Sequence, residues 1–94
     1  MITYELAKKL KDAGFPQRLD ISRQVRLADE DAIYAPDRET LIEACGEGFK
    51  ELQKVDGGWR AIGIKDSVIV CMNNVPEEAV ANLWLALNKK KWQQ

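Results

Sequence analysis

The chain has 94 residues, of which 46% are hydrophobic and 31% are charged, the composition of one small globular domain rather than of a disordered chain. Its formal net charge of −1 gives no overall attraction to nucleic acid or to anionic lipid. It contains no histidine, which excludes the Ser-His-Asp and Cys-His nucleophile pairs and the common zinc ligand sets.

The first predicted element is an amphipathic helix over residues 4–13. Thr3 precedes it with a side chain that can accept a hydrogen bond from a free backbone N–H of the first turn. Gly14 can take the left-handed position that ends a helix, and Phe15 can then fold back onto Leu10 in a Schellman closure.

Residues 18–27 alternate between apolar and polar, which predicts a strand with one buried face. Arg23 falls on the apolar face, and two interpretations stay open. It is either an inward charge that discourages edge-to-edge pairing or a partly buried guanidinium that binds an anion. Residues 29–31 predict an acidic turn, and residues 32–34 predict a short second strand.

A second helix is predicted to begin after Pro36, with Asp37 as its N-cap. Gly46 and Gly48 are expected to end it, because each glycine costs about 1 kcal/mol in a helix interior.

From residue 49 the pattern indicates three strands, 49–55, 59–64 and 67–72, joined by tight turns into an antiparallel meander. Residues 68–71 are continuously apolar, so we expect the third strand to be central and covered on both faces.

The last helix is predicted to begin near Pro76, with Trp84 on its apolar stripe and Lys89–Lys91 at its end. Trp92 lies beyond it. The patterns together predict a single α+β domain over residues 1–94, of order α-β-β-α-β-β-β-α. Its helices pack on an antiparallel sheet that contains the three-stranded C-terminal meander plus one or two N-terminal strands.

The two cysteines, Cys45 and Cys71, occupy apolar positions of different elements and are interpreted as reduced core thiols, with a disulfide or a reactive thiol as the alternatives. No apolar run approaches the roughly 20 residues that span a bilayer, and the first residues do not form a signal peptide. We therefore expect a cytoplasmic protein with no membrane partner. No motif for a metal, nucleotide or other cofactor occurs, so no cofactor is expected.

Two groups of residues are candidates for ligand binding. Trp59 and Arg60, with Arg23 as a neighbour, could stack a base and pair a phosphate. The alternative is that Trp59 covers the sheet while Arg60 is solvated. Tyr34 and Arg38 flank a predicted helix start and form a second candidate anion site.

Three stretches together, ELAKKLKDAGFPQ (5–17), YAPDRETLIEACGE (34–47) and PEEAVANLWLALNKK (76–90), resemble a family of short phage and prophage proteins. The resemblance covers about two thirds of the chain. It implies a mobile-element origin and lends no activity, ligand or site residue. Relatives tend to have threonine where Val75 stands, so Asn74 is the expected cap of the last helix. The C-terminal half also resembles, more weakly, the sheet-and-helix half of HicB-type antitoxins.

These observations predict a small non-enzymatic binding protein of phage or mobile-element origin. Its expected role is to bind a host protein, or to sequester a small anionic, nucleotide-like ligand, and so to inhibit a host defence. An exposed sheet edge on so small a domain favours a homo-oligomer. The alternative function is an antitoxin-like regulatory protein that binds a partner protein, and nucleic acid through Lys89–Lys91. The slightly acidic chain makes nucleic acid the less favoured partner.

Overall fold

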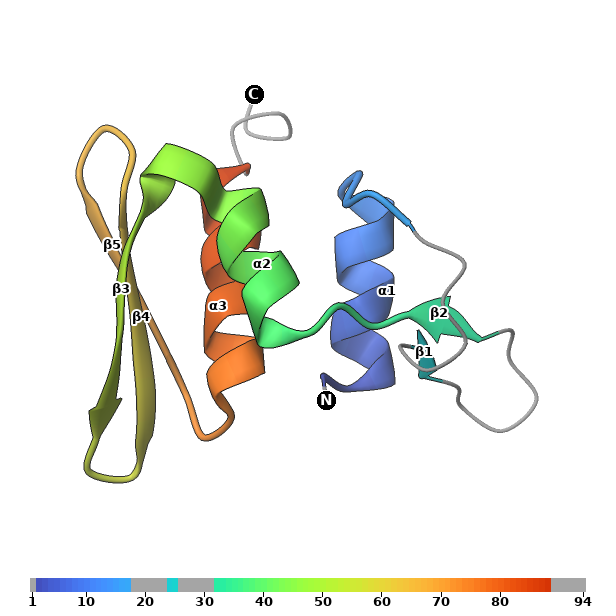
Figure 1. The fold of residues 1–94 in the computed structure, drawn as a ribbon, viewed down its shortest axis with the longest axis horizontal. Coiled ribbons are helices and arrows are strands. Elements are labelled where there is room, and N and C mark those ends of the chain that lie inside the picture. The colour runs from blue at the N-terminus through green and yellow to red at the C-terminus, as the bar shows by residue number, and fades with distance from the viewer. Residues whose placement is uncertain (1, 18–23, 26–31, 89–94) are drawn as a thin grey trace.

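The computed structural model describes residues 2–17, 24–25 and 32–88, and confirms the α+β fold and the predicted order of its elements. In these ranges three helices accompany a three-stranded antiparallel sheet, and a two-stranded ribbon lies at the opposite end of the molecule (Figure 1). The elements are α1 (Tyr4–Asp12), β1 (Gln24–Val25), β2 (Ile33–Tyr34), α2 (Arg38–Cys45), the 3₁₀ turn η2 (Gly46–Gly48), β3 (Phe49–Val55), β4 (Gly58–Ile64), β5 (Val68–Asn73) and α3 (Pro76–Leu87).

Both ends of α1 have the predicted capping. The Thr3 hydroxyl accepts a hydrogen bond from the Leu6 N–H at 3.2 Å. Gly14 has a φ of 95°, and the Phe15 N–H donates to the Leu10 carbonyl at 2.9 Å, which is the bond that defines a Schellman closure. The closure turns the Phe15 ring into the core, where it lies edge-on against Trp84 with 4.9 Å between the ring centroids.

The two N-terminal strands pair with each other and do not extend the three-stranded sheet. Gln24 lies opposite Tyr34, and Val25 lies opposite Ile33. The other residues of the predicted strand 18–27, Arg23 included, and the predicted acidic turn 29–31 lie outside the described residues, as do Lys89–Lys91 and Trp92.

The second helix begins and ends where the sequence predicts. The Asp37 carboxylate accepts a hydrogen bond from the Thr40 N–H at 2.9 Å, which caps α2. Gly46, with a φ of 60°, ends the helix, and the η2 turn leads directly into β3.

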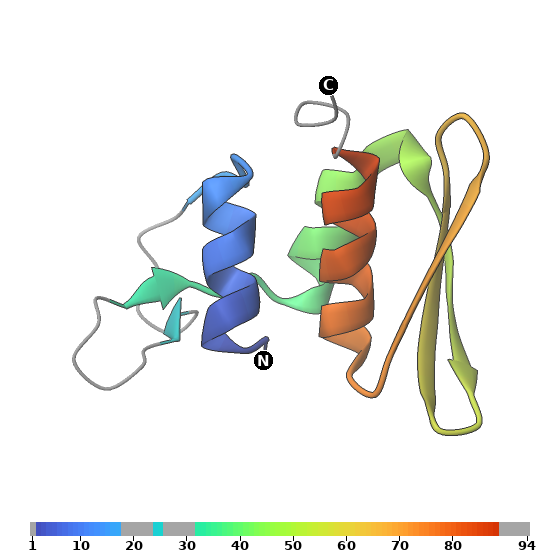
Figure 2. The same ribbon diagram turned by 180° about the vertical axis from the view of Figure 1, so that it is seen from behind.

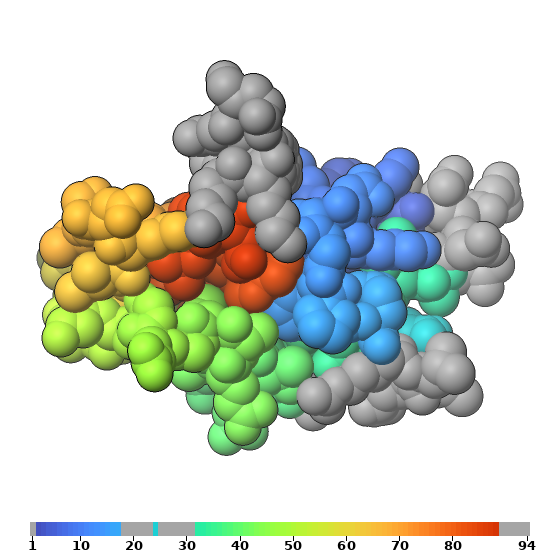
Figure 3. Space-filling view, turned by 90° about the horizontal axis from the view of Figure 1, so that it is seen from above, coloured from blue at the N-terminus to red at the C-terminus, as the bar shows by residue number. Residues whose placement is uncertain are grey.

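The three C-terminal strands form a meander in the order β3-β4-β5, and helices cover one face of it. Figures 1 and 2, drawn from opposite sides, both place α3 and α2 on the same face of this sheet, with α1 beyond them. Seen from above, the C-terminal end of α3 lies between the strands and α1 (Figure 3).

The central position of α3 explains why its apolar residues are not confined to one narrow stripe. It packs against β4 and β5 on one side and against α1 and α2 on the other. Five of its residues are therefore buried: Ala79, Val80, Ala81, Leu83 and Trp84. The burial of Trp84 confirms the prediction that it belongs to the core.

Gly63 allows α3 to approach the sheet closely. A Cβ atom at this position of β4 would lie 2.8 Å from Leu83 Cδ1 and 2.6 Å from the Gly48 carbonyl oxygen. Only a residue without a side chain fits between these two neighbours.

Two details of the C-terminal half differ from the predictions. The third strand of the meander, β5, is an edge strand rather than a central one, and within the described residues one of its two faces is covered. The N-cap of α3 is Val75, not Asn74, and the valine side chain makes no capping hydrogen bond. The Asn73 side chain instead accepts a hydrogen bond from the Val75 N–H at 3.0 Å.

Candidate functional site

The face of the three-stranded sheet that points away from the helices carries exposed apolar side chains. Along β4, the buried residues Ala61 and Gly63 face the helices, so Ile62 and Ile64 point to the opposite, outer face. The strand register places Ile62 opposite Val70 and Ile64 opposite Val68. The outer face of β4 and β5 is therefore lined by neighbouring apolar side chains, which we call the outer patch: Ile62, Ile64, Val68, Val70 and Met72.

Four of the five side chains of the outer patch are exposed, and Ile62 is half-buried. Val68 is 63% exposed, Met72 61%, Val70 50% and Ile64 44%, and these four are the large hydrophobic residues that stand exposed among the described part of the chain. Single exposed apolar residues are common on soluble proteins, whereas a contiguous group on one sheet face marks an interaction site or an aggregation hazard.

A polar network lies beside the outer patch on β3 and β4. The Gln53 side-chain oxygen accepts two hydrogen bonds from the Arg60 guanidinium, at 3.0 Å from Nε and 2.6 Å from Nη2. The Gln53 amide nitrogen in turn donates to the Glu51 carboxylate at 2.5 Å. Arg60 lies opposite Met72 in the register, so this network borders the patch and holds the arginine side chain in one orientation.

The structure does not bring Trp59 and Arg60 together. Successive residues of a strand point to opposite faces, and Trp59 packs against the core on the helix side while Arg60 lies on the outer face. The Lys54 ammonium lies 5.6 Å from the centroid of the Trp59 ring. This position of Trp59 agrees with the alternative interpretation of the sequence, in which the tryptophan covers the sheet. Arg23, the third member of this group, is outside the described residues.

Tyr34 and Arg38 also differ in burial, and Arg38 has carboxylates beside it. Tyr34 is 5% exposed and belongs to the core, whereas Arg38 is exposed at the start of α2. Arg38 lines a hollow of about 310 Å³ together with three carboxylates, those of Asp37, Glu39 and Glu77. This excess of negative charge disfavours an anionic ligand at the helix start.

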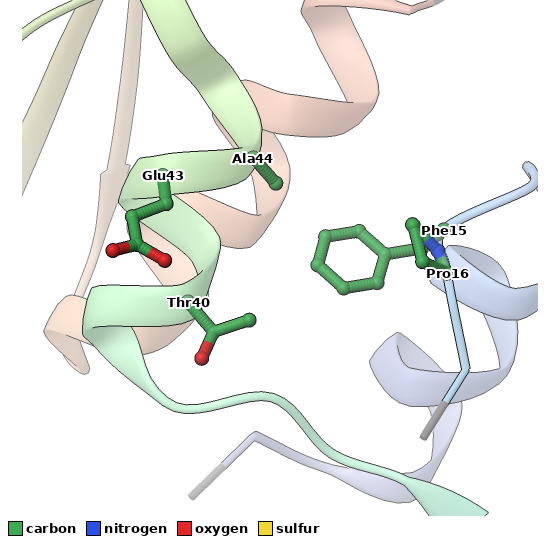
Figure 4. A pocket seen from close by; sticks show the side chains of 5 residues that line it. All are labelled: Phe15, Pro16, Thr40, Glu43 and Ala44. Carbon is green, nitrogen blue, oxygen red and sulfur yellow. The ribbon is translucent and has the colours of Figure 1, made fainter.

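A second hollow, of about 220 Å³, separates the end of α1 from α2 (Figure 4). Phe15 and Pro16 form one side of it, and Thr40, Glu43 and Ala44 form the other. The charged group among these five lining residues is the Glu43 carboxylate, so this hollow also lacks what an anionic ligand requires.

The two cysteines are half-buried free thiols. Burial raises the pKa of Cys45 to about 12, and the charge of the nearby Cys71 thiolate adds to the rise. Burial also raises the pKa of Cys71. Both groups are protonated at neutral pH, which makes them poor nucleophiles.

Within residues 2–17, 24–25 and 32–88, no three histidine, cysteine or acidic side chains are grouped so that they could hold a metal ion. In the same ranges, none of the helices has the length and hydropathy needed to cross a bilayer. No protein-family model, no curated protein and no solved structure matches this chain.

Proposed function

We propose that this chain is a small non-enzymatic binding protein that acts by binding another protein through the outer patch. The observation that carries the proposal is the exposure of four large apolar side chains, Ile64, Val68, Val70 and Met72, on one face of adjacent strands. Burying such side chains against a partner removes apolar surface from water, which is the main favourable term in protein association.

The surroundings of the outer patch fit the anatomy of a protein interface. An apolar centre on β4 and β5 is bordered on one side by the hydrogen-bonded side chains of Glu51, Gln53 and Arg60. Interfaces commonly combine an apolar centre with a polar rim, and arginine is enriched in them. Because Gln53 already orients Arg60, less side-chain freedom is lost when a partner binds there.

The same geometry gives less support to the small anionic ligand. The aromatic ring and the guanidinium that would hold it, Trp59 and Arg60, lie on opposite faces of β4. The two hollows described above are lined by carboxylates rather than by an excess of cations. A protein partner is therefore the better-supported ligand class.

The resemblance to short phage and prophage proteins supports a narrower form of this proposal. In that form the chain originates from a phage or another mobile element, and the partner is a host protein, such as a component of an antiviral defence that the bound chain inhibits. The chemistry of the outer patch predicts that such a partner presents an apolar surface of its own.

Photo-crosslinking in bacterial cells tests the proposal. A photoreactive amino acid is placed at Val68 in the outer patch and, as the matched control, at Lys8, which is exposed on α1. The α1 helix lies beyond α2 and α3, away from the sheet (Figure 1). We expect one defined heterologous protein to be captured from position 68 and not from position 8. We also expect Val68→Asp to abolish co-purification of that protein.

Capture of the same proteins from both positions, or of nothing but the chain itself, would refute the proposed function. A native mass spectrum of the purified protein provides the second test. A stoichiometric anionic small molecule in that spectrum would favour the ligand-sequestering alternative over a protein partner.

A further inference from the structure

The two edges of the three-stranded sheet differ in how they resist pairing with another strand. The edge strand β3 carries exposed Lys50, Glu51 and Lys54, and its register with β4 is irregular between Phe49 and Glu51. Charges and register irregularities are the features by which proteins protect sheet edges.

The other edge strand, β5, has none of these features. Its sequence, Val-Ile-Val-Cys-Met-Asn, contains no lysine, arginine, carboxylate or proline, and its register with β4 is regular from Val68 to Asn73. In the described part of the chain, β5 pairs with β4 along one side, and no strand pairs with its other side. The unprotected backbone of this edge can accept a further strand.

The sequence of β5 is suited to pairing with itself. Antiparallel pairing about a twofold axis perpendicular to the sheet keeps each residue on its own face only if one residue lies directly opposite its own counterpart, with the axis midway between the two. An axis at Val70 lets nearly every residue of β5 pair with a residue of the other copy. It places Val70 opposite its own counterpart, Val68 opposite the counterpart of Met72, and Ile69 opposite the counterpart of Cys71.

Every pair in this register is apolar, so no like charges meet. Like charges directly opposite each other destabilise a strand pair, and a symmetric pair cannot avoid them when its strand is charged. The edge strand β3 illustrates the difference: an axis at Leu52 would place Lys50 opposite the counterpart of Lys54. Self-pairing is therefore favoured at β5 and opposed at β3.

We infer that β5 pairs antiparallel with β5 of a second copy of this chain, forming a twofold-symmetric dimer with one continuous six-stranded sheet. Both copies of α3 then cover the same face of the joined sheet, because α3 packs on β4 and β5 in each copy. The two outer patches become one continuous apolar surface on the opposite face. This dimer goes beyond the proposed function and would form whether or not a heterologous partner exists.

Sedimentation velocity across protein concentrations from about 1 µM to about 1 mM tests the inference. We expect the mass to rise with concentration from that of the 10.7 kDa chain to twice that value. A wild-type protein that stays monomeric throughout this range would overturn the inference.

Charge substitutions on the axis test the register. Val70 is 50% exposed, so Val70→Lys and Val70→Glu leave the folded chain intact, which circular dichroism verifies. Each variant alone places like charges opposite each other, and we expect both to be monomeric. An equimolar mixture of the two variants places opposite charges there, and we expect it to regain the dimer. A dimeric V70K, or a mixture that stays monomeric, would contradict self-pairing at Val70.

Three further variants distinguish edge pairing from packing of one outer patch onto another. V68K/M72E places opposite charges in facing positions and should remain dimeric, whereas V68K/M72K should be monomeric. Ile64→Lys places a charge in the outer patch on β4, away from the β5 edge, and should also remain dimeric. Loss of the dimer in I64K or in V68K/M72E would refute the edge-paired arrangement.

The results also separate this inference from the proposed function. A monomeric wild-type protein that is still crosslinked from Val68 to one heterologous protein would overturn the dimer and leave the proposed function standing. A dimer that responds to the charge substitutions as expected, with no heterologous protein captured from Val68, would overturn the proposed function and leave the dimer standing.

Discussion

Gly63→Ala tests the close packing of α3 on the sheet. The added Cβ would lie 2.6 Å from the Gly48 carbonyl oxygen and 2.8 Å from Leu83 Cδ1. Real Cβ contacts essentially never fall below 3.0 Å, so the backbone at Gly48 and the Leu83 side chain must both move. Moving the Gly48 backbone is costly because Gly48 leads directly into the β3 strand that pairs with β4.

The magnitude follows from two opposing terms. Overpacking a well-packed core costs about 1–3 kcal/mol. Replacing glycine by alanine within a strand recovers roughly 0.5–1 kcal/mol, because glycine loses more backbone freedom on folding. The two terms leave a net loss of roughly 0–2.5 kcal/mol. Because the backbone at Gly48 must move, we expect the upper part of this range, a fall of about 1–2 kcal/mol in the free energy of unfolding. For a domain of this size each kcal/mol lowers the melting temperature by about 4–8 °C.

Urea unfolding followed by circular dichroism measures the change, with Gly48→Ala as the matched control. A Cβ at Gly48 would lie 3.0 Å from Leu87 Cδ1, the far end of a flexible side chain that can move aside. We expect Gly48→Ala to cost clearly less than Gly63→Ala. Equal urea midpoints for Gly63→Ala and the wild type would refute the close approach of α3 to β4.

Three further predictions concern the caps, the aromatic contact and the buried thiol. Thr3→Ala and Asp37→Ala should each lower the free energy of unfolding by about 1 kcal/mol in urea titrations, and unchanged midpoints would contradict the caps seen on α1 and α2. Phe15→Leu should cost about 1 kcal/mol through loss of the edge-on contact with Trp84, whereas a value near zero would exclude a stabilising ring pair. Because the folded state raises the pKa of Cys45 from 9.0 to about 12, the stability that the protonated thiol contributes is complete below pH 9 and declines as the pH rises toward 12. Cys45→Ala should therefore lose less stability than the wild type between pH 9 and 12, and identical pH profiles would refute the burial of this thiol.

The fold follows from the sequence where a local signal has a single structural meaning. The ends of α1 are determined by Thr3, whose hydroxyl caps the first turn, and by Gly14 and Phe15, which form the Schellman closure. Asp37 and Gly46 determine the ends of α2 in the same way. The prediction that Asn74 caps α3 is wrong: the N-cap is Val75, which has no polar side chain, and the Asn73 side chain bonds to the Val75 N–H just before the helix.

The candidate site was harder to predict because it depends on what surrounds each strand. Trp59 and Arg60 are adjacent in sequence, yet the alternation of strand side chains separates them, and period-two geometry alone could have indicated this. Glu39 and Glu77, which oppose an anion beside Arg38, come from two helices that only the tertiary fold brings together.

The apolar run in β5 shows most clearly why the sequence alone does not predict the candidate site. A strand with both faces apolar is expected at the centre of a covered sheet, because each face then avoids water. In this chain α3 covers only Ile69 and Cys71, while Val68, Val70 and Met72 remain exposed at the edge. The sequence pattern predicts burial of both faces of β5, whereas the described part of a single copy covers one of them. The face that stays exposed is the one that a partner protein would cover under the proposed function, because the edge-paired dimer joins the two outer patches without covering either of them.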